Sequence, residues 1–253
     1  MGCHLHELAE NMLVGKTEWY TSLTDNEVIV VVNAFLDNYE NAVCFDGGSI
    51  DSFIDGGYKR IDELVELPFD ICWVEFSVVD SSIADFSIIC FLLIKQKDGF
   101  IALNFKRQKN KNDWMFDFSC FRPKRGGLEV SICDKSGIIE DAIRNQMELI
   151  SRFLTAINCV NIEIVEEKPD KKIQKKRKKR GKVPLFSRWT LHIKINKSIN
   201  KQNNYGRSHA SPRIHLRRGH ARRLRSGVYC WVSACIVGNK ENGIIHKDYK
   251  VIN

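Results

Sequence analysis

The chain has 253 residues, of which 43% are hydrophobic and 28% charged, and a formal net charge of +8; this composition excludes an intrinsically disordered protein and allows one large domain or two small ones. Its nine cysteines are scattered and form no CxxC pair, which excludes a structural zinc site of the usual spacing and indicates reduced thiols. No apolar run reaches the roughly 18 residues that cross a bilayer, so we expect no membrane contact, and we predict no metal and no cofactor.

The first 60 residues predict two helices. A short helix is expected over residues 3–13, and apolar residues at helical spacing predict another over 25–38, with Thr24 or Asp25 as the N-cap. Asp46-Gly47-Gly48 and Asp55-Gly56-Gly57 are both rich in turn residues. We therefore expect the segment between these two triplets to be irregular.

From Phe69 onward the pattern is that of a β-sheet. Short polar turns separate five candidate strands, at residues 70–79, 87–95, 100–106, 114–121 and 128–133. A helix is predicted over 138–158, because its apolar residues recur on one face. The sequence therefore predicts an α+β fold: a mostly antiparallel sheet with one long helix packed on it.

Trp73 and Glu75 alternate with apolar residues on one of these strands, which places a carboxylate beside an indole on one strand face. An active site is one interpretation. A single carboxylate without a visible partner is weak evidence for catalysis, however, so we favour a half-exposed strand residue.

Charge divides the chain sharply after Val165. Residues 1–167 hold 15 Lys and Arg against 28 Asp and Glu, a net −13, whereas residues 168–225 hold 21 basic residues and one acidic residue, a net +20. Such asymmetry indicates a polyanionic partner. Residues 171–182 (KKIQKKRKKRGK) have almost no apolar residue, and we expect a mobile tether or an arm that orders on contact. We therefore predict an acidic α+β domain (1–167), a polycationic linker (168–183) and a basic β-rich module (184–253).

The basic module has further strand signals. A strand is expected over residues 188–195, another over 213–218, and a third over 228–237 after the turn at Ser226-Gly227. Asn242-Gly243 predicts a hairpin into a last strand. We interpret the region as a small antiparallel meander with an arginine- and histidine-bearing surface. Cys230 and Cys235 with His220 or His246 do not favour a metal site, because a spacing of five puts the two thiols on opposite strand faces.

The module carries the pattern HxRRGHxRR from His215 to Arg223, then Gly227, Trp231-Val232, Val237-Gly238 and KDYxV from Lys247 to Val251. This pattern resembles the C-terminal module of a group of uncharacterised phage and prophage proteins, and segments from Leu67 onward resemble the middle of such proteins. The resemblance implies a mobile-element origin and a bacterial host cytoplasm. It implies no activity and no catalytic residue.

We predict that the module binds RNA or DNA. Arginine recognises phosphate in a planar, bidentate way, and an exposed Trp231 would stack on bases. Arg217, Arg218, Arg222 and Arg223 are the principal predicted phosphate ligands. The full predicted nucleic-acid-binding set is Arg213, His215, Arg217, Arg218, His220, Arg222, Arg223, Arg225, Trp231, Lys175, Lys176, Arg177, Lys178, Lys179 and Arg180.

Two alternatives remain open. A metal-independent ribonuclease needs a general base, a general acid and a cation at the phosphorane, roles that His215, His220 and Arg218 have the right chemistry to fill. A phage anti-defence factor would instead bind a host or defence-system protein, and its acidic half would mimic nucleic acid or shield the basic half. Binding without catalysis is the interpretation we favour, and if the chain is an enzyme, we expect a nuclease.

Overall fold

The computed structural model describes residues 3–15, 25–49, 65–78, 86–97, 99–109, 114–117, 120–124, 127–131, 139–194, 213–217, 220–232, 235–237 and 239–244. The chain divides into two compact units. The first contains residues 1–158 and 164–192, and the second contains residues 159–163 and 193–253. The predicted three-part division at residues 167 and 183 stays a prediction about which parts fold independently.

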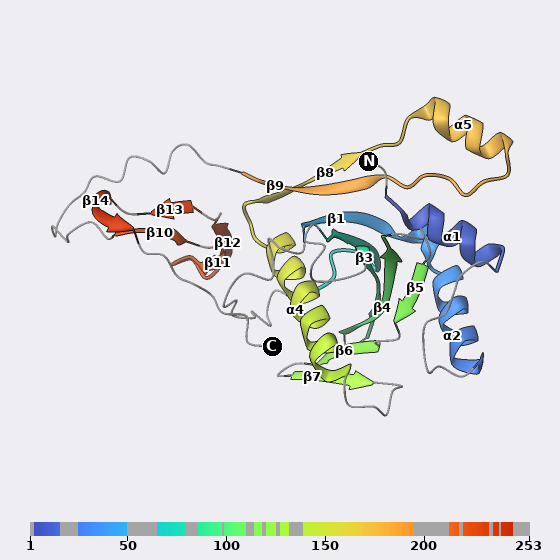
Figure 1. The fold of residues 1–253 in the computed structure, drawn as a ribbon, viewed down its shortest axis with the longest axis horizontal. Helices are drawn as coiled ribbons and strands as arrows, with labels where there is room; N and C mark the ends of the chain where they lie inside the picture. Colours follow the sequence, from blue (N-terminus) through green and yellow to red (C-terminus); the bar gives the residue numbers. More distant parts are fainter. Residues whose placement is uncertain are drawn as a thin grey trace. The chain divides into compact units, whose positions relative to one another are not determined.

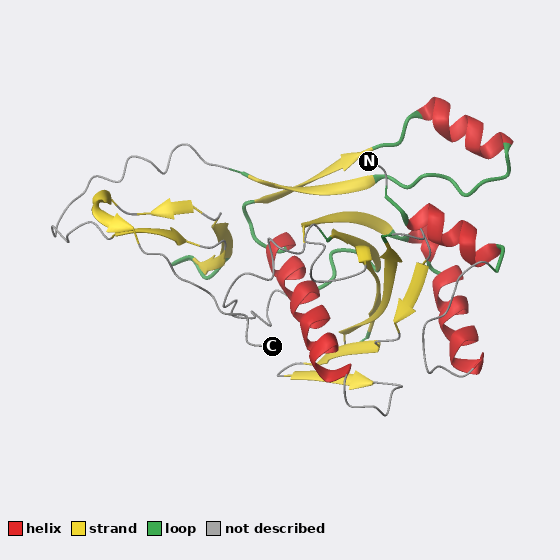
Figure 2. Ribbon diagram, in the orientation of Figure 1, coloured by secondary structure: helices red, strands yellow, loops and turns green. Residues whose placement is uncertain are grey.

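A seven-stranded mixed sheet forms the centre of the first unit (Figures 1 and 2). Its strand order is β5-β4-β3-β2-β1-β9-β8. Strands β2 to β5 pair antiparallel, whereas β1 runs parallel to both β2 and β9, so the fold is α+β with a mostly antiparallel sheet. The strands are β1 (Val43–Ser49), β2 (Ile71–Ser77), β3 (Phe86–Gln96), β4 (Gly99–Gln108), β5 (Trp114–Asp117), β8 (Ile162–Glu167) and β9 (Arg188–Ile193). A separate hairpin consists of β6 (Cys120–Lys124) and β7 (Gly127–Ser131).

Helices cover both faces of this sheet. Helix α4 (Ile139–Ile157) packs Met147, Ile150, Phe153 and Leu154 against Phe76 and its neighbours on one face. Helices α1 (Leu5–Leu13) and α2 (Asp25–Leu36) pack on the opposite face, against a cluster that includes Trp73, Leu92, Phe105 and Trp114. The sequence predicted one long helix packed on the sheet. This prediction is incomplete, because the described residues form four α-helices.

Strand β1 includes Asp46-Gly47-Gly48, which the sequence had indicated as turn-rich. Gly47 lies in close contact with the ring of Phe76: a Cβ built at this position would be 2.4 Å from that ring. Gly48 has a φ of +78°, and the β1–β2 register shifts between Asp46 and Ser49. The two glycines therefore form a bulge in the strand and make room for an aromatic ring.

The composition of residues 171–182 predicted a mobile tether or an arm that orders on contact, and the structure has a helix in most of this segment. Residues 171–179 form helix α5 (Lys171–Lys179) in the connection between the paired strands β8 and β9. A polycationic segment has little tendency to fold alone. Here specific contacts to other residues of the first unit hold it, as described below.

The second unit contains two small sheets. Strand β10 (Arg213–Arg217) lies between β13 (Cys235–Val237), which is antiparallel to it, and β14 (Asn239–Ile244), which is parallel. Strands β11 (His220–Arg223) and β12 (Tyr229–Val232) form an antiparallel hairpin. The sequence predicted a single antiparallel meander. The described strands instead form two sheets, one of which contains a parallel pair. The hairpin predicted at Asn242-Gly243 is wrong, because both residues belong to β14.

Candidate functional site

Helix α5 is anchored at its N-terminus and along one side. The Asp170 side chain caps the helix by accepting hydrogen bonds from the backbone N–H groups of Lys172 (2.6 Å) and Ile173 (3.2 Å). Gln174 exchanges two hydrogen bonds with the backbone of Leu185, at 2.6 and 2.9 Å. These contacts satisfy the helix terminus and fix the chain that returns to β9.

Arg177 is the cation that turns inward. Its guanidinium donates to the carbonyl of Val183 at 2.8 Å and to the carboxylate of Glu10 on α1 at 2.5 Å. The Glu10 carboxylate also lies 3.9 Å from the ammonium of Lys182. Arg177, which the sequence placed among the nucleic-acid ligands, is therefore partly buried and serves to attach α5 to α1.

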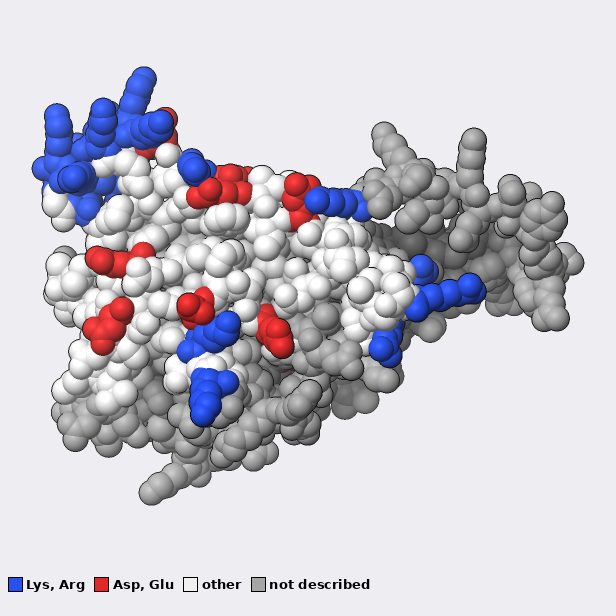
Figure 3. Space-filling model, turned by 180° about the vertical axis from the view of Figure 1, so that it is seen from behind, with Lys and Arg blue, Asp and Glu red and all other residues white. Residues whose placement is uncertain are grey.

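The other predicted cations of α5, and Arg180 directly after the helix, face solvent. Figure 3 shows Lys and Arg side chains standing out together from this part of the surface. Among the predicted ligands, exposed side chains are those of Lys175, Lys176, Lys178, Lys179 and Arg180.

Several residues predicted to bind nucleic acid lie in the second unit. Those whose side chains the structure describes are on the β11–β12 hairpin or in its turn. Register pairs His220 with Val232, Ala221 with Trp231, Arg222 with Cys230 and Arg223 with Tyr229. Directly paired residues share a face of a hairpin. Arg222 and Arg223 are therefore both exposed but lie on opposite faces, so the two do not form one continuous row of phosphate ligands.

One face of the hairpin combines arginine with aromatic rings. The guanidinium carbon of Arg223 lies 5.9 Å from the ring centroid of Tyr229, within the range of a cation–π contact. Trp231 is half-buried two residues further along the same face. Arg225, in the turn between the two strands, is exposed.

Asn161 holds strand β12 in place. Its side-chain carbonyl accepts from the backbone N–H of Trp231 at 2.6 Å, and its side-chain amide donates to the carbonyl of the same residue at 2.8 Å. The N–H of Val160 donates to the carbonyl of Tyr229 at 3.0 Å. The short segment after α4 thus acts as a further partner for β12, 70 residues away in the sequence.

Several predicted site residues lie outside what the structure describes. Arg218 and His246 fall in undescribed segments, and for Arg213, His215 and Arg217 only the backbone, in β10, is described. His220 is half-buried on β11. The pairing of His215 with His220 that the ribonuclease hypothesis requires is therefore untested and stays a hypothesis.

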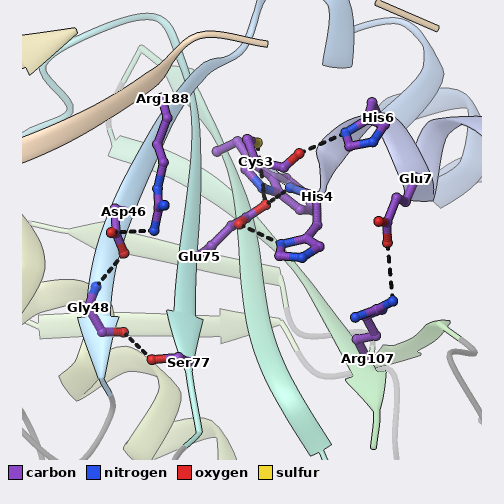
Figure 4. Close-up of polar contacts among 11 residues, drawn as sticks. Cys3, His4, His6, Glu7, Asp46, Gly48, Glu75, Ser77, Arg107 and Arg188 are labelled. Atoms are coloured by element: carbon purple, nitrogen blue, oxygen red, sulfur yellow. Dashed lines mark hydrogen bonds and ion pairs between the residues drawn. The ribbon is translucent and has the colours of Figure 1, made fainter. Parts of the chain in front are cut away.

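Glu75 is buried, not half-exposed, which corrects the interpretation from strand alternation. It is only 8% exposed, because α1 and the segment before it cover this face of the sheet (Figure 4). Its carboxylate accepts from the Trp73 indole at 2.7 Å, from the His4 backbone N–H at 2.5 Å, from the Cys3 thiol at 3.3 Å, and lies 3.0 Å from Nδ1 of His4. Burial raises the pKa of Glu75, but the hydrogen bonds and charge of His4 and the bond from Trp73 outweigh it, so this pKa lies below its ordinary value.

Two other polar contacts connect elements of the first unit. Arg188 on β9 pairs with Asp46 on β1, and Arg107 on β4 lies 3.5 Å from Glu7 on α1 (Figure 4). The part of the chain that the structure describes holds no group of three or more His, Cys, Asp or Glu side chains placed to bind a metal ion. None of the described helices is long and apolar enough to cross a membrane.

Comparison with known families gives a match. A model of the AcrVA2-like family, described as the anti-CRISPR type V subtype A2 family, matches residues 60–239. That range is well over half of the chain and includes β2 to β13, with α4 and α5. This chain belongs to the AcrVA2-like family. In broad kind it is therefore a phage anti-defence protein, and a protein of a defence system is its expected partner. Neither the curated proteins nor the solved structures gave a match.

Membership of the AcrVA2-like family agrees with the anti-defence alternative better than with direct nucleic-acid binding. The sequence did not reveal the anchoring role of Arg177, the buried Glu75 or the clamp formed by Asn161. A local signal existed for the helix that carries Arg177, because Asp170 is a good N-cap residue before a run of helix-favouring lysines. The Asn161 clamp had none, because its partner is distant in the sequence.

Proposed function

We propose that this chain suppresses a type V CRISPR system by binding a protein of that system. The observation that carries the proposal is membership of the anti-CRISPR family over residues 60–239. The matched range contains both α5 and the β11–β12 hairpin, the two exposed cationic elements described above. A protein partner was the alternative interpretation of the sequence, and the family favours it.

The β11–β12 hairpin is the surface that we assign to the protein partner. Exposed Arg223 shares a face of the hairpin with half-buried Tyr229 and Trp231, while exposed Arg222 lies on the other face and exposed Arg225 in the turn. Arginine, tyrosine and tryptophan are the residue types enriched at protein interfaces and at their energetic hot spots. Because Asn161 already fixes the backbone of Trp231, little conformational entropy is lost when a partner binds.

A second candidate for the same hairpin is nucleic-acid binding, the function first indicated by the sequence. The observation in its favour is the three exposed arginines, a residue type that binds phosphate in a bidentate way. The ligands on this hairpin would be Arg222, Arg223 and Arg225, with Trp231 as the stacking residue. The salt dependence of the binding affinity distinguishes the two candidates. Affinity for phosphates falls steeply with the logarithm of the salt concentration, whereas affinity at a packed protein interface falls less.

The experiment uses cells whose type V CRISPR system targets an infecting phage. We expect the expressed chain to restore infection, and the purified chain to bind a purified protein of that system. Arg222→Glu with Arg223→Glu is expected to weaken that binding by at least about thirtyfold, the effect of losing a hot spot of about 2 kcal/mol. Restoration of infection is expected to fall with it.

A matched control changes the same charge elsewhere. Lys95→Glu with Lys97→Glu alters two exposed lysines of the first unit and is expected to leave both the binding and the restored infection unchanged. If the chain restores infection equally in cells that lack the CRISPR system, or binds none of its purified proteins, the proposed function is wrong. Loss of activity in the control alone would mean that the hairpin is not the docking surface.

A further inference from the structure

Helix α5 presents six lysines on one side. At about 100° per residue, they cover an arc of about 160° of the helix circumference. The inward-facing Gln174 and Arg177 lie roughly opposite the middle of this arc. All six lysines are exposed, and they are Lys171, Lys172, Lys175, Lys176, Lys178 and Lys179.

These six charges are not neutralised within the part of the chain that the structure describes. The nearest acidic residue in the sequence, Asp170, uses its carboxylate to cap the helix. Glu10 on α1 pairs with Arg177 and Lys182, not with the outer lysines. No described ion pair includes any of the six. Among the residues that the structure describes, the arc is therefore a dense positive surface without compensating carboxylates.

The helix keeps this surface in spite of its own repulsion. Lys171 and Lys175, Lys172 and Lys176, and Lys175 and Lys179 are like charges four residues apart, which destabilise a helix. The cap by Asp170, the Gln174 contacts with Leu185 and the Arg177 contacts hold it in place. A bound polyanion would relieve the repulsion, and because the helix is already ordered, binding would cost little conformational entropy.

The composition of the arc indicates which polyanion it fits. Lysine is depleted at protein interfaces, whereas as a compact point charge it is a common phosphate ligand. The arc contains no aromatic residue to stack on bases and no Asn, Gln or Arg to read base edges. It is therefore suited to phosphates and not to an interface core or to a specific base sequence.

The width of the arc indicates two rows of phosphates. A single backbone strand faces only a narrow stripe of a helix, whereas six lysines spread over about 160° face in two directions at once. Helix α5 is about 14 Å long and about 10–12 Å across with its side chains, dimensions close to those of the groove between the two strands of a duplex, which is about 12 Å wide in B-DNA.

We propose that α5 binds the phosphate backbone of a double-helical nucleic acid, independently of sequence, with the two flanks of the lysine arc facing the two strands. DNA and RNA duplexes share this chemistry. The proposal goes beyond the docking of a defence protein on the β11–β12 hairpin and holds whether or not that docking occurs.

The test measures binding of the full-length chain to labelled 20-base-pair duplexes of DNA and of RNA, and to the matching single strands, by fluorescence anisotropy between about 50 and 200 mM salt. The variant carries Lys172→Gln, Lys175→Gln and Lys176→Gln. Since each phosphate contact contributes about 0.9 to the slope of log affinity against log salt for duplex DNA, we expect the slope to become shallower by about 2–3 and the affinity to fall at least about tenfold.

The control carries Lys95→Gln, Lys97→Gln and Lys194→Gln, which remove the same charge from exposed positions outside α5. We expect its slope and affinity for duplexes to match those of the unmodified chain. Circular dichroism and thermal unfolding of both variants check that the fold is kept. A higher affinity for the DNA duplex or for the RNA duplex identifies the kind of nucleic acid that α5 binds. Both results support the proposal.

Three outcomes would overturn it: an unchanged slope in the α5 variant, an equal effect in the control, or single strands bound as tightly as duplexes. The readout is separate from CRISPR suppression. If the α5 variant loses duplex affinity while the chain fails to suppress a type V system, the nucleic-acid site stands and the proposed function fails. If the chain suppresses a type V system and this depends on Arg222 and Arg223, while the salt slope of duplex binding is unchanged in the α5 variant, the proposed function stands and the nucleic-acid site fails.

Discussion

The carboxylate of Glu75 accepts a hydrogen bond from the indole N–H of Trp73 at 2.7 Å and a second from the backbone N–H of His4 at 2.5 Å. Both donors lie on the face of the sheet that α1 covers. A buried carboxylate is stable only when its acceptors are satisfied. The Glu75 carboxylate therefore joins the residues at the start of the chain to the centre of the sheet.

This arrangement predicts a pH dependence of stability. Because the pKa of Glu75 is lowered in the folded chain, its stabilising contribution is fully present above the ordinary value of about 4.5 and is lost as pH falls through the lowered pKa. Urea unfolding of the native chain and of Glu75→Gln between pH 3 and 7 measures this. We expect the difference in the free energy of unfolding between the native chain and Glu75→Gln to be largest near neutral pH and to become smaller below about pH 4.5. Parallel profiles for the two proteins would contradict it.

Substitution at Gly47 tests the close approach of β1 and β2. A Cβ at this position would lie 2.4 Å from the ring of Phe76, so Gly47→Ala is expected to reduce the free energy of unfolding by about 1–3 kcal/mol through overpacking. Combining it with Phe76→Leu is expected to cost less than the sum of the two single changes, because the smaller side chain makes room. Strictly additive effects in the double-mutant cycle would mean that the ring is not the obstacle.

Loss of the α5 cap is expected to loosen the helix locally. Asp170→Ala removes the acceptor for the N–H groups of Lys172 and Ile173, which typically costs about 0.5–2 kcal/mol. Hydrogen exchange of the α5 amides is expected to speed up, while exchange in β3 and β4 stays the same. Asp170→Asn is the matched control, because asparagine caps equally well. Equal exchange in the alanine and asparagine variants would show that the cap does not hold α5.

Two thiols are expected to resist alkylation in the folded chain. Burial raises the pKa of Cys72 to about 12 and, with a smaller effect from Cys230, the pKa of Cys159 to about 12. At pH 8 the reactive thiolate is then roughly one ten-thousandth of each. Iodoacetamide followed by peptide mass spectrometry is expected to label both only in denaturant. Rapid labelling of either thiol in the native chain would contradict its burial.

The sequence by itself determined the elements that have a strong local pattern. Strand signals over residues 70–79, 87–95 and 100–106 correspond to β2, β3 and β4, and the helical pattern over 138–158 corresponds to α4. Alternation also sorted the faces of β2 correctly, since Val74 and Phe76 pack towards α4 while Trp73 packs towards α1 and α2. The separation of charge between the two parts of the chain is likewise a property of the sequence alone.

Tertiary structure decided the features in which distant segments meet. Glu75 is buried because α1 covers a face that alternation alone left open to solvent, and β1 is a strand because Gly47 makes room for Phe76. Helix α5 forms because Asp170, Leu185, Val183 and Glu10 hold a segment whose charges repel one another. Local propensity is a small term in free energy, so contacts between residues far apart in the chain outweigh it wherever they are numerous and specific.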